Sequence, residues 1–149
     1  MINDNLKLRG DVAIVLKDKN GNVKESRDVN NLVVTAGLTF ICARMAAASA
    51  DVMSHMALGS GTTAVAAGDT DLESILGSRE ALDSSTASAN TIAYVSSFEA
   101  GEGTGAVTEA GIFNAATSGT MLCHVVFPVV NKQADDTMSV TWTITLTAS

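Results

Sequence analysis

The sequence predicts an all-β protein, a β-sandwich with one short α-helix near residues 36-48. Three observations support this fold class. Short segments in which apolar and polar residues alternate recur along the chain, as expected for strands with one face in a core. Turn-forming residues separate these segments. Only one segment has the apolar spacing of a helix, and many short strands are typical of a sandwich.

The first predicted element is a β-hairpin. Residues 10–16 alternate apolar residues with smaller or polar ones. Asn20 and Gly21 then form the strongest short turn signal, and a second extended segment begins at Val23. Charged residues in both segments indicate a hairpin with solvated edges.

The predicted helix begins after Thr35, whose side chain can cap the first turn. Alanines at positions 46–48 favour its continuation. Its inward face is expected to consist of apolar residues spaced three and four apart: Leu38, Ile41, Cys42 and Met45.

The rest of the chain is predicted to form further strands. A long exposed loop is expected at residues 59–70, and no regular structure is assigned to the Ser-, Ala- and Asp-rich residues 77–89. The last strand has the clearest pattern, with Trp142 among the inward-facing residues and Ser or Thr at every outward position. The predicted strands cover residues 53–58, 92–98, 107–113, 121–127 and 138–147.

Length and composition favour a single domain, residues 1-149. Aromatic residues make up only 4% of the chain and apolar residues 46%, so the core is expected to be mainly aliphatic. Cys42 and Cys123 are expected to be buried free thiols in a reducing compartment. The N-terminus lacks a signal-peptide pattern and no apolar run approaches the roughly 18 residues that span a bilayer. We therefore expect synthesis in the cytoplasm and no membrane partner.

Charge is unevenly distributed. Residues 1–50 carry seven basic and five acidic side chains, whereas residues 51–149 carry two basic and eleven acidic ones, which gives +2 and −9. Phosphate binding draws its affinity from clustered Lys and Arg. Nucleic acid is therefore not an expected partner.

Searches for catalytic and ligand motifs give no convincing site. His55 and His124 are the only histidines and lie among apolar residues, which favours packed or interface positions over general-base roles. The residues after Gly59-Ser60-Gly61 do not complete a phosphate-binding loop. We expect no enzyme activity, cofactor or resident metal.

A calcium loop is the weak alternative for the acidic segment that begins at Asp69. Asp71, Glu73 and Glu80 have suitable spacing, but Ser74 replaces the turn-making glycine of such loops. A solvated loop is the preferred interpretation.

Residues 108–114 contain the run Glu109-Ala110-Gly111-Ile112-Phe113. This run resembles a recurring strand of structural proteins from tailed-bacteriophage particles, in which a turn and a second strand follow; here that second strand begins at residues 119–122. The resemblance extends, in the same order along the chain, to residues 31–37, 56–63, 69–73 and 136–144.

The resemblance is strongest to capsid decoration (cement) proteins, and it is shared with tail-fibre and baseplate proteins. It implies a jelly-roll sandwich on the capsid surface that bridges subunits of the major capsid protein as a homo-oligomer, a dimer or a trimer. The alternative is a tail-fibre or baseplate component with a receptor-binding or assembly role. The motif residues are Glu109, Gly111 and Phe113. Gly111 permits a bulge or a close approach. Glu109 is expected either to accept a hydrogen bond from a nearby loop or simply to be exposed. The expected interface residues are Leu6, Leu8, Arg9, Gly59, Gly61, Leu122, His124 and Val126.

Overall fold

The structure, a computed structural model, describes residues 5–46 and 50–148 and has the all-β fold with one short helix that the sequence predicts. Within these residues the only helix, α1, is too short to cross a membrane. The elements are β1 (Leu6–Lys17), β2 (Val23–Val33), α1 (Thr35–Ala46), β3 (His55–Gly59), β4 (Glu80–Ala81), β5 (Ser84–Ser88), β6 (Thr91–Phe98), β7 (Gly105–Phe113), β8 (Met121–Lys132) and β9 (Thr137–Ala148).

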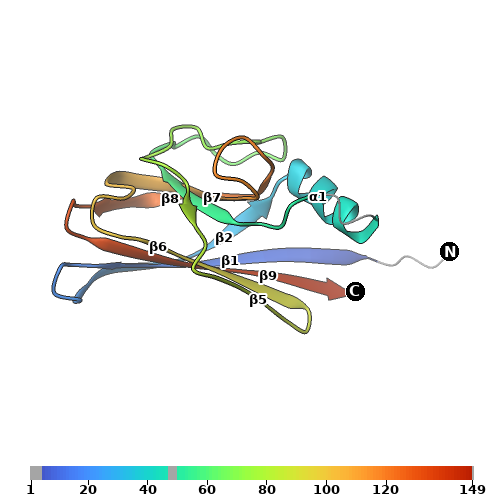
Figure 1. The fold of residues 1–149 in the computed structure, drawn as a ribbon, viewed down its shortest axis with the longest axis horizontal. Coiled ribbons are helices and arrows are strands. Elements are labelled where there is room, and N and C mark those ends of the chain that lie inside the picture. Colours follow the sequence, from blue (N-terminus) through green and yellow to red (C-terminus); the bar gives the residue numbers. More distant parts are fainter. Residues whose placement is uncertain (1–4, 47–49, 149) are drawn as a thin grey trace.

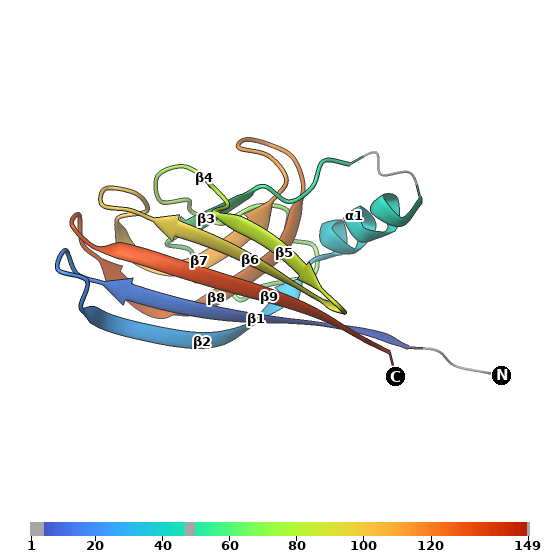
Figure 2. The same ribbon diagram turned by 60° about the horizontal axis from the view of Figure 1, so that its bottom comes forward.

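The strands form one antiparallel sheet in the order β4-β3-β7-β8-β2-β1-β9-β6-β5, which curls so that its two halves face each other (Figures 1 and 2). The halves join where β2 pairs with β8 at only two positions, Leu32 with His124 and Val33 with Cys123. This order does not confirm the jelly-roll arrangement, because all nine strands belong to one sheet.

The core lies between the two halves and is built mainly from alternate residues of each strand. In the central pair β1–β9, Val12 lies opposite Trp142 and Ile14 lies opposite Val140, and all four side chains are fully buried. Each such side chain contributes about 1.5–3 kcal/mol by leaving water. The predicted inward face of the last strand is confirmed as far as Ile144.

The predicted hairpin is confirmed. β1 and β2 pair from Gly10 opposite Asn31 to Lys17 opposite Val23, and Gly21 in the turn has a φ of 82°, a conformation that glycine adopts at little cost. The amide of Gly21 donates to the carbonyl of Asp18. This hairpin therefore forms from local sequence signals.

The predicted helix is confirmed, but of the four residues expected to face inward only Ile41 packs against the core; positions 47 and 48 of the predicted range lie outside the described residues. Leu38, Cys42 and Met45 are exposed. The helix instead lies with Gly37 against the backbone of Leu122 in β8, where a side chain would overlap it. The expectation of a buried thiol is thus wrong for Cys42 and confirmed for Cys123.

Two strand predictions were incomplete. β8 continues through Pro128 to Lys132, where the sequence indicated a loop, and β4 and β5 form within residues that were assigned no regular structure. Proline fits in β8 because the strand beyond His124 pairs only with β7, which leaves its other edge free.

Candidate functional site

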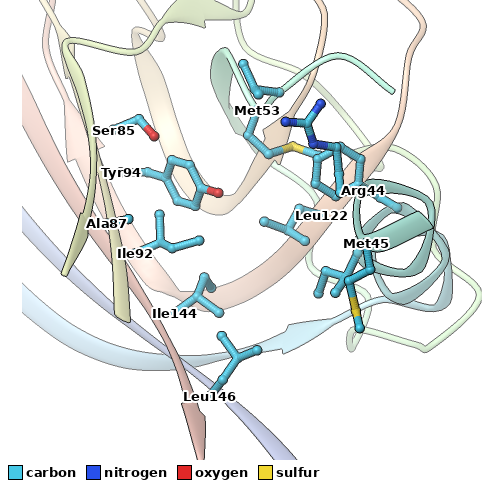
Figure 3. A pocket seen from close by; sticks show the side chains of 13 residues that line it. Arg44, Met45, Met53, Ser85, Ala87, Ile92, Tyr94, Leu122, Ile144 and Leu146 are labelled. Atoms are coloured by element: carbon cyan, nitrogen blue, oxygen red, sulfur yellow. The ribbon is translucent and has the colours of Figure 1, made fainter. Parts of the chain in front are cut away.

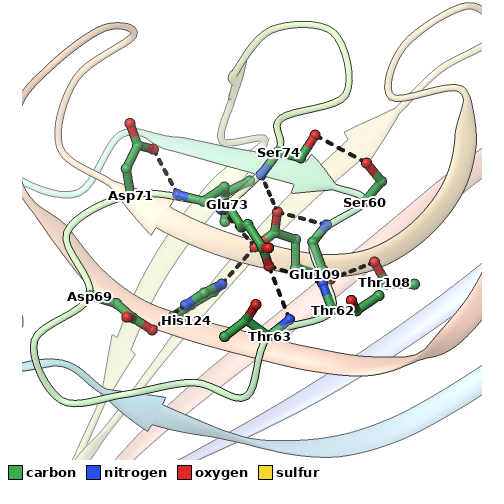
Figure 4. Close-up of polar contacts among 12 residues, drawn as sticks. Ser60, Thr62, Thr63, Asp69, Asp71, Glu73, Ser74, Thr108, Glu109 and His124 are labelled. Carbon is green, nitrogen blue, oxygen red and sulfur yellow. Dashed lines mark hydrogen bonds and ion pairs between the residues drawn. The ribbon is translucent and has the colours of Figure 1, made fainter.

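A buried acidic residue lies at the centre of the most polar part of the interior. Glu109 of β7 is 0% exposed and His124 of β8 is 4% exposed. Because Gly111 pairs with His124 and Glu109 pairs with Val126, the two side chains are diagonal neighbours on one face of the sheet. The segment between β3 and β4, residues 60–79, covers this face (Figure 4). We call this segment the covering loop.

The carboxylate of Glu109 is fully occupied by hydrogen bonds from the protein. Its Oε1 atom accepts from the amides of Gly61, at 3.0 Å, and Ser74, at 2.8 Å. Its Oε2 atom accepts from the amide of Glu73, at 3.1 Å, and lies 2.8 Å from Nε2 of His124. A carboxylate has about four lone-pair positions, and here each one has a donor. The expectation that Glu109 accepts a hydrogen bond from a nearby loop is confirmed.

His124 joins Glu109 to a second carboxylate. Its Nδ1 atom lies 2.8 Å from Oδ2 of Asp69, which also accepts the amide of Ala66 at 2.9 Å. Both histidine contacts are hydrogen bonds when each ring nitrogen carries a hydrogen, because ionised carboxylates only accept. The hydrogen bond from Ala66, together with that from His124, lowers the pKa of Asp69.

Acidic side chains also organise the covering loop itself. Oε2 of Glu73 accepts the amides of Thr62, at 3.1 Å, and Thr63, at 3.0 Å, and these bonds, chiefly those from Thr63, lower the pKa of Glu73. The hydroxyl of Thr108 donates to the carbonyl of Gly61 at 2.6 Å. Backbone groups that have no strand partner are thereby satisfied.

The calcium-loop alternative gains no support from this geometry. Carboxylate oxygens of Asp69 and Glu73 are directed at backbone amides of the loop. Across residues 5–46 and 50–148, no group of three or more His, Cys, Asp or Glu side chains is arranged to hold a metal ion.

Two glycines allow the carboxylate of Glu109 to approach the loop. A Cβ atom at Gly59 would lie 2.5 Å from Oε1 of Glu109, and one at Gly61 would lie 2.6 Å from the same atom. Gly111 provides the close approach that was expected of it, because a Cβ atom there would lie 3.1 Å from the side chains of both Leu72 and Phe113. It is not a bulge, because it pairs regularly with both neighbouring strands.

The third motif residue, Phe113, anchors a second loop. Its buried ring lies under the guanidinium of Arg79, 3.6 Å from the ring centroid. Arg79 also donates to the carbonyls of Ala115, at 2.9 Å, and Ser118, at 2.6 Å. The covering loop and the β7–β8 turn are thus held together at Phe113.

The predicted interface residues separate into two groups. Gly59, Gly61, Leu122 and His124 are buried by the chain itself, so a partner would reach them only after the covering loop or α1 moved. Leu6 and Arg9 are exposed, whereas Leu8 and Val126 are half-buried. An interface that includes this second group remains a prediction.

The sequence did not reveal that Asp69 and Glu73 belong with Glu109, because the contacts join residues 35 to 55 positions apart. His55, the other histidine, lies in β3, and its Nδ1 atom is 2.8 Å from the hydroxyl of Ser54. Comparison of the chain with protein-family models, curated proteins and solved structures gives no match.

Proposed function

We propose that the chain is a structural protein of a tailed-bacteriophage particle, a capsid decoration protein that stabilises the head by bridging major capsid subunits. It acts through buried contact area and not through chemistry at a site. Many copies of a modest contact stiffen a shell, because each bound copy opposes separation of the subunits that it bridges.

The observation that carries the proposal is the convergence of the resembling segments on Glu109. Glu109 comes from residues 108–114, Gly61 from residues 56–63, and Glu73 from residues 69–73. Segments that are separate in the sequence therefore form one structural unit. Because the four lone-pair positions of the carboxylate are filled, this unit fits a role in holding the fold better than a role in binding or catalysis.

The distribution of basic side chains supports docking with a fixed orientation. Arg79 and Lys132, the two basic residues of 51–149, are both buried in contacts within the chain. Nζ of Lys132 donates to the carbonyls of Glu99, at 2.9 Å, and Asp136, at 2.7 Å. Exposed cationic groups of the described residues therefore come from the first third of the chain and include those of the β1–β2 hairpin, while acidic groups dominate elsewhere. Such asymmetry orients a protein on a charged surface.

Binding to purified phage heads that lack decoration protein tests the proposal. The recombinant protein is expected to bind these heads and to raise the temperature at which they disrupt. Leu6→Asp should weaken binding, because Leu6 is exposed and belongs to the predicted interface. Val129→Asp is the control: Val129 is 45% exposed, lies in β8, and belongs neither to the predicted interface nor to the cationic β1–β2 hairpin. Absence of both binding and stabilisation would rule out the decoration role.

Electron microscopy of particles labelled with an antibody to this chain distinguishes the head from the tail. Label over the head surface is the expected result. Label confined to the tail would instead assign the chain to a tail fibre or baseplate. Sedimentation of the purified protein should show the predicted homo-oligomer, and a monomer at all concentrations would contradict that part of the proposal.

A further inference from the structure

The imidazole of His124 lies between two carboxylates, and its two contacts depend on its protons. Nδ1 lies 2.8 Å from Oδ2 of Asp69, and Nε2 lies 2.8 Å from Oε2 of Glu109 (Figure 4). A neutral imidazole has one N–H, so it can donate to only one of two ionised carboxylates. Both hydrogen bonds therefore exist together only when these three side chains hold one proton more than a neutral ring and two carboxylates.

The groups that face the ring allow its charge to change. Carboxylates surround it from two elements: Glu109 from β7, and Asp69, Asp71 and Glu73 from the covering loop. The third element beside it, β2, contributes the uncharged Leu32. Attraction to the carboxylates favours the charged ring, and burial opposes it. A surface hollow of about 250 Å³ is lined by His124 and the loop carboxylates, so water can exchange a proton with the ring.

Loss of the proton breaks the contact with Asp69 and keeps the contact with Glu109. The side chain of Glu109 is fully buried, whereas that of Asp69 is 27% exposed. A buried acceptor that loses its donor costs more free energy than an acceptor that water can reach. The single N–H of the neutral ring therefore stays on Nε2. The lone pair of Nδ1 then faces Oδ2 of Asp69, and the two repel each other.

The contact with Asp69 fastens the middle of the covering loop, residues 64–70. The amides that Glu109 accepts lie on either side of this part: those of Gly61, Glu73 and Ser74. A second hydrogen bond, from the amide of Thr35 to the carbonyl of Ala67 at 2.8 Å, connects the same part to the start of α1. Most residues of this part are exposed, so few packing contacts hold it in place.

We propose that His124 is a pH-dependent switch, which holds residues 64–70 against the sheet while its ring is protonated and releases them when the proton leaves. The flanking parts of the covering loop stay bound to Glu109 in both states. Acid weakens the same contact only below the ordinary range of Asp69, since the hydrogen bonds from Ala66 and His124 lower its pKa. The switch goes beyond the proposed capsid role and does not depend on it.

The switch is confined to the polar cluster. An apolar cavity of about 490 Å³ lies between α1 and the part of the sheet formed by β5, β6 and β9 (Figure 3). No residue of the covering loop lines it. Release of residues 64–70 therefore leaves this cavity unchanged and uncovers the ring of His124, one of the predicted interface residues.

NMR of the wild-type protein from about pH 5 to about pH 9 tests the proposal. Long-range proton–nitrogen spectra of His124 should show both ring nitrogens protonated at the lower end and a single N–H, on Nε2, at the upper end. Hydrogen-exchange protection of the Thr35 amide, corrected for the intrinsic exchange rate, should fall about tenfold or more over this range, as expected for a lost charge-assisted hydrogen bond. The Gly61 amide, which donates to Glu109, should keep its protection.

Three variants identify the groups responsible. Asp69→Ala removes the partner of Nδ1, so the Thr35 amide should have low protection at every pH. Asp71→Ala is the matched control, because it removes a carboxylate of the same loop whose contact is with Arg79, and it should keep a response of the wild-type size. His55→Gln removes the only other histidine, so a response that survives in this variant belongs to His124.

Several results would overturn the proposal. These are a ring with one N–H at about pH 5 or two at about pH 9, a neutral ring whose hydrogen is on Nδ1, and Thr35 protection that stays constant while the ring titrates. Wild-type protection in Asp69→Ala would show that other contacts hold residues 64–70. Loss of the response in His55→Gln would assign it to the other histidine, and an equal fall at Gly61 would show that the whole covering loop opens.

Discussion

The Nε2 atom of His124 lies 2.8 Å from Oε2 of Glu109, a carboxylate that also accepts three backbone amides of the covering loop. Glu109, a residue of the sheet, thus supplies hydrogen-bond acceptors for backbone amides of the covering loop that have no partner in a strand or a helix. The covering loop is therefore held to β7 and β8 by charge-assisted hydrogen bonds in a buried setting.

Glu109→Gln tests how much this cluster stabilises the fold. The amide nitrogen of Gln cannot accept, so two buried donors lose their partner and the free energy of unfolding should fall by about 3 kcal/mol. Urea unfolding measures the change. Glu80→Gln is the control, because the carboxylate of Glu80 accepts one exposed hydrogen bond, from the hydroxyl of Ser78. This variant should change the free energy of unfolding by less than about 0.5 kcal/mol. Similar losses in both variants would contradict the special role of Glu109.

Acid should destabilise the protein partly through Asp136. Its carboxylate lies 2.7 Å from Nζ of Lys24, and this contact, with the amide of Gln133, lowers its pKa. As the pH falls below about 4, the unfolded chain binds the proton first. The contribution to stability is therefore present above that pH and is lost as the pH falls through the lower pKa of the folded state.

Asp136→Asn should accordingly make the fall in stability below pH 4 shallower than in the wild type. Unfolding midpoints between pH 7 and pH 2 measure this slope. Asp135→Asn removes the neighbouring exposed carboxylate and should keep the wild-type slope. If the two variants have the same acid profile, the contact between Lys24 and Asp136 is not responsible.

The missing side chain of Gly10 leaves room for Asn31, the hydrogen-bond partner of Trp142. A Cβ atom at Gly10 would overlap Oδ1 of Asn31, which accepts the indole N–H of Trp142 at 3.0 Å. Gly10→Ala should therefore displace Asn31 and lower the free energy of unfolding by about 1–3 kcal/mol. Gly68→Ala is the matched control, because a Cβ atom there meets no atom within 4 Å. Thermal unfolding measures the change. Equal losses of stability in Gly10→Ala and Gly68→Ala would refute this explanation.

The two cysteines should differ in reactivity. Cys42 is exposed on α1, whereas Cys123 is buried in β8, and burial raises the pKa of its thiol. Since the thiolate is the reactive form, a disulfide reagent should modify one thiol in the native protein and the second only after denaturation. Cys42→Ser should abolish the native reaction. Two equally fast thiols in the native protein would show that β8 opens readily.

The sequence predicted those elements whose signal is local. The hairpin has a turn signal between two alternating segments, and β9 has a strict period of two ending near Leu146. β5 was missed because Ser84 to Ser88 contains no large apolar residue, so its pairing with β6 decides its conformation. The sequence predicted that β8 ends at Phe127, because proline lacks the amide that a strand with two neighbours needs. Pro128 fits within β8 because β2 pairs with this strand only as far as His124, which the sequence does not reveal.

The face of α1 and the polar cluster depend on contacts between distant residues. Helical spacing identified Leu38 and Met45 as inward, but the approach of Gly37 to Leu122 rotates the helix so that both are exposed. For Glu109, the sequence indicated a loop contact and identified the motif. It could not reveal His124 and Asp69 as members of the cluster. The register between β7 and β8 brings His124 next to Glu109, and the fold of the covering loop brings Asp69 next to His124.

Only two residue pairs join β2 to β8, Leu32 with His124 and Val33 with Cys123. Under a load that pulls the two halves apart, these pairs have few parallel bonds to share the force, unlike the long ladder between β1 and β9. We therefore expect this narrow join to separate before the ladder between β1 and β9 does. A neighbouring molecule that bound both halves of the sheet would hold them together, so its binding would also make this protein more rigid.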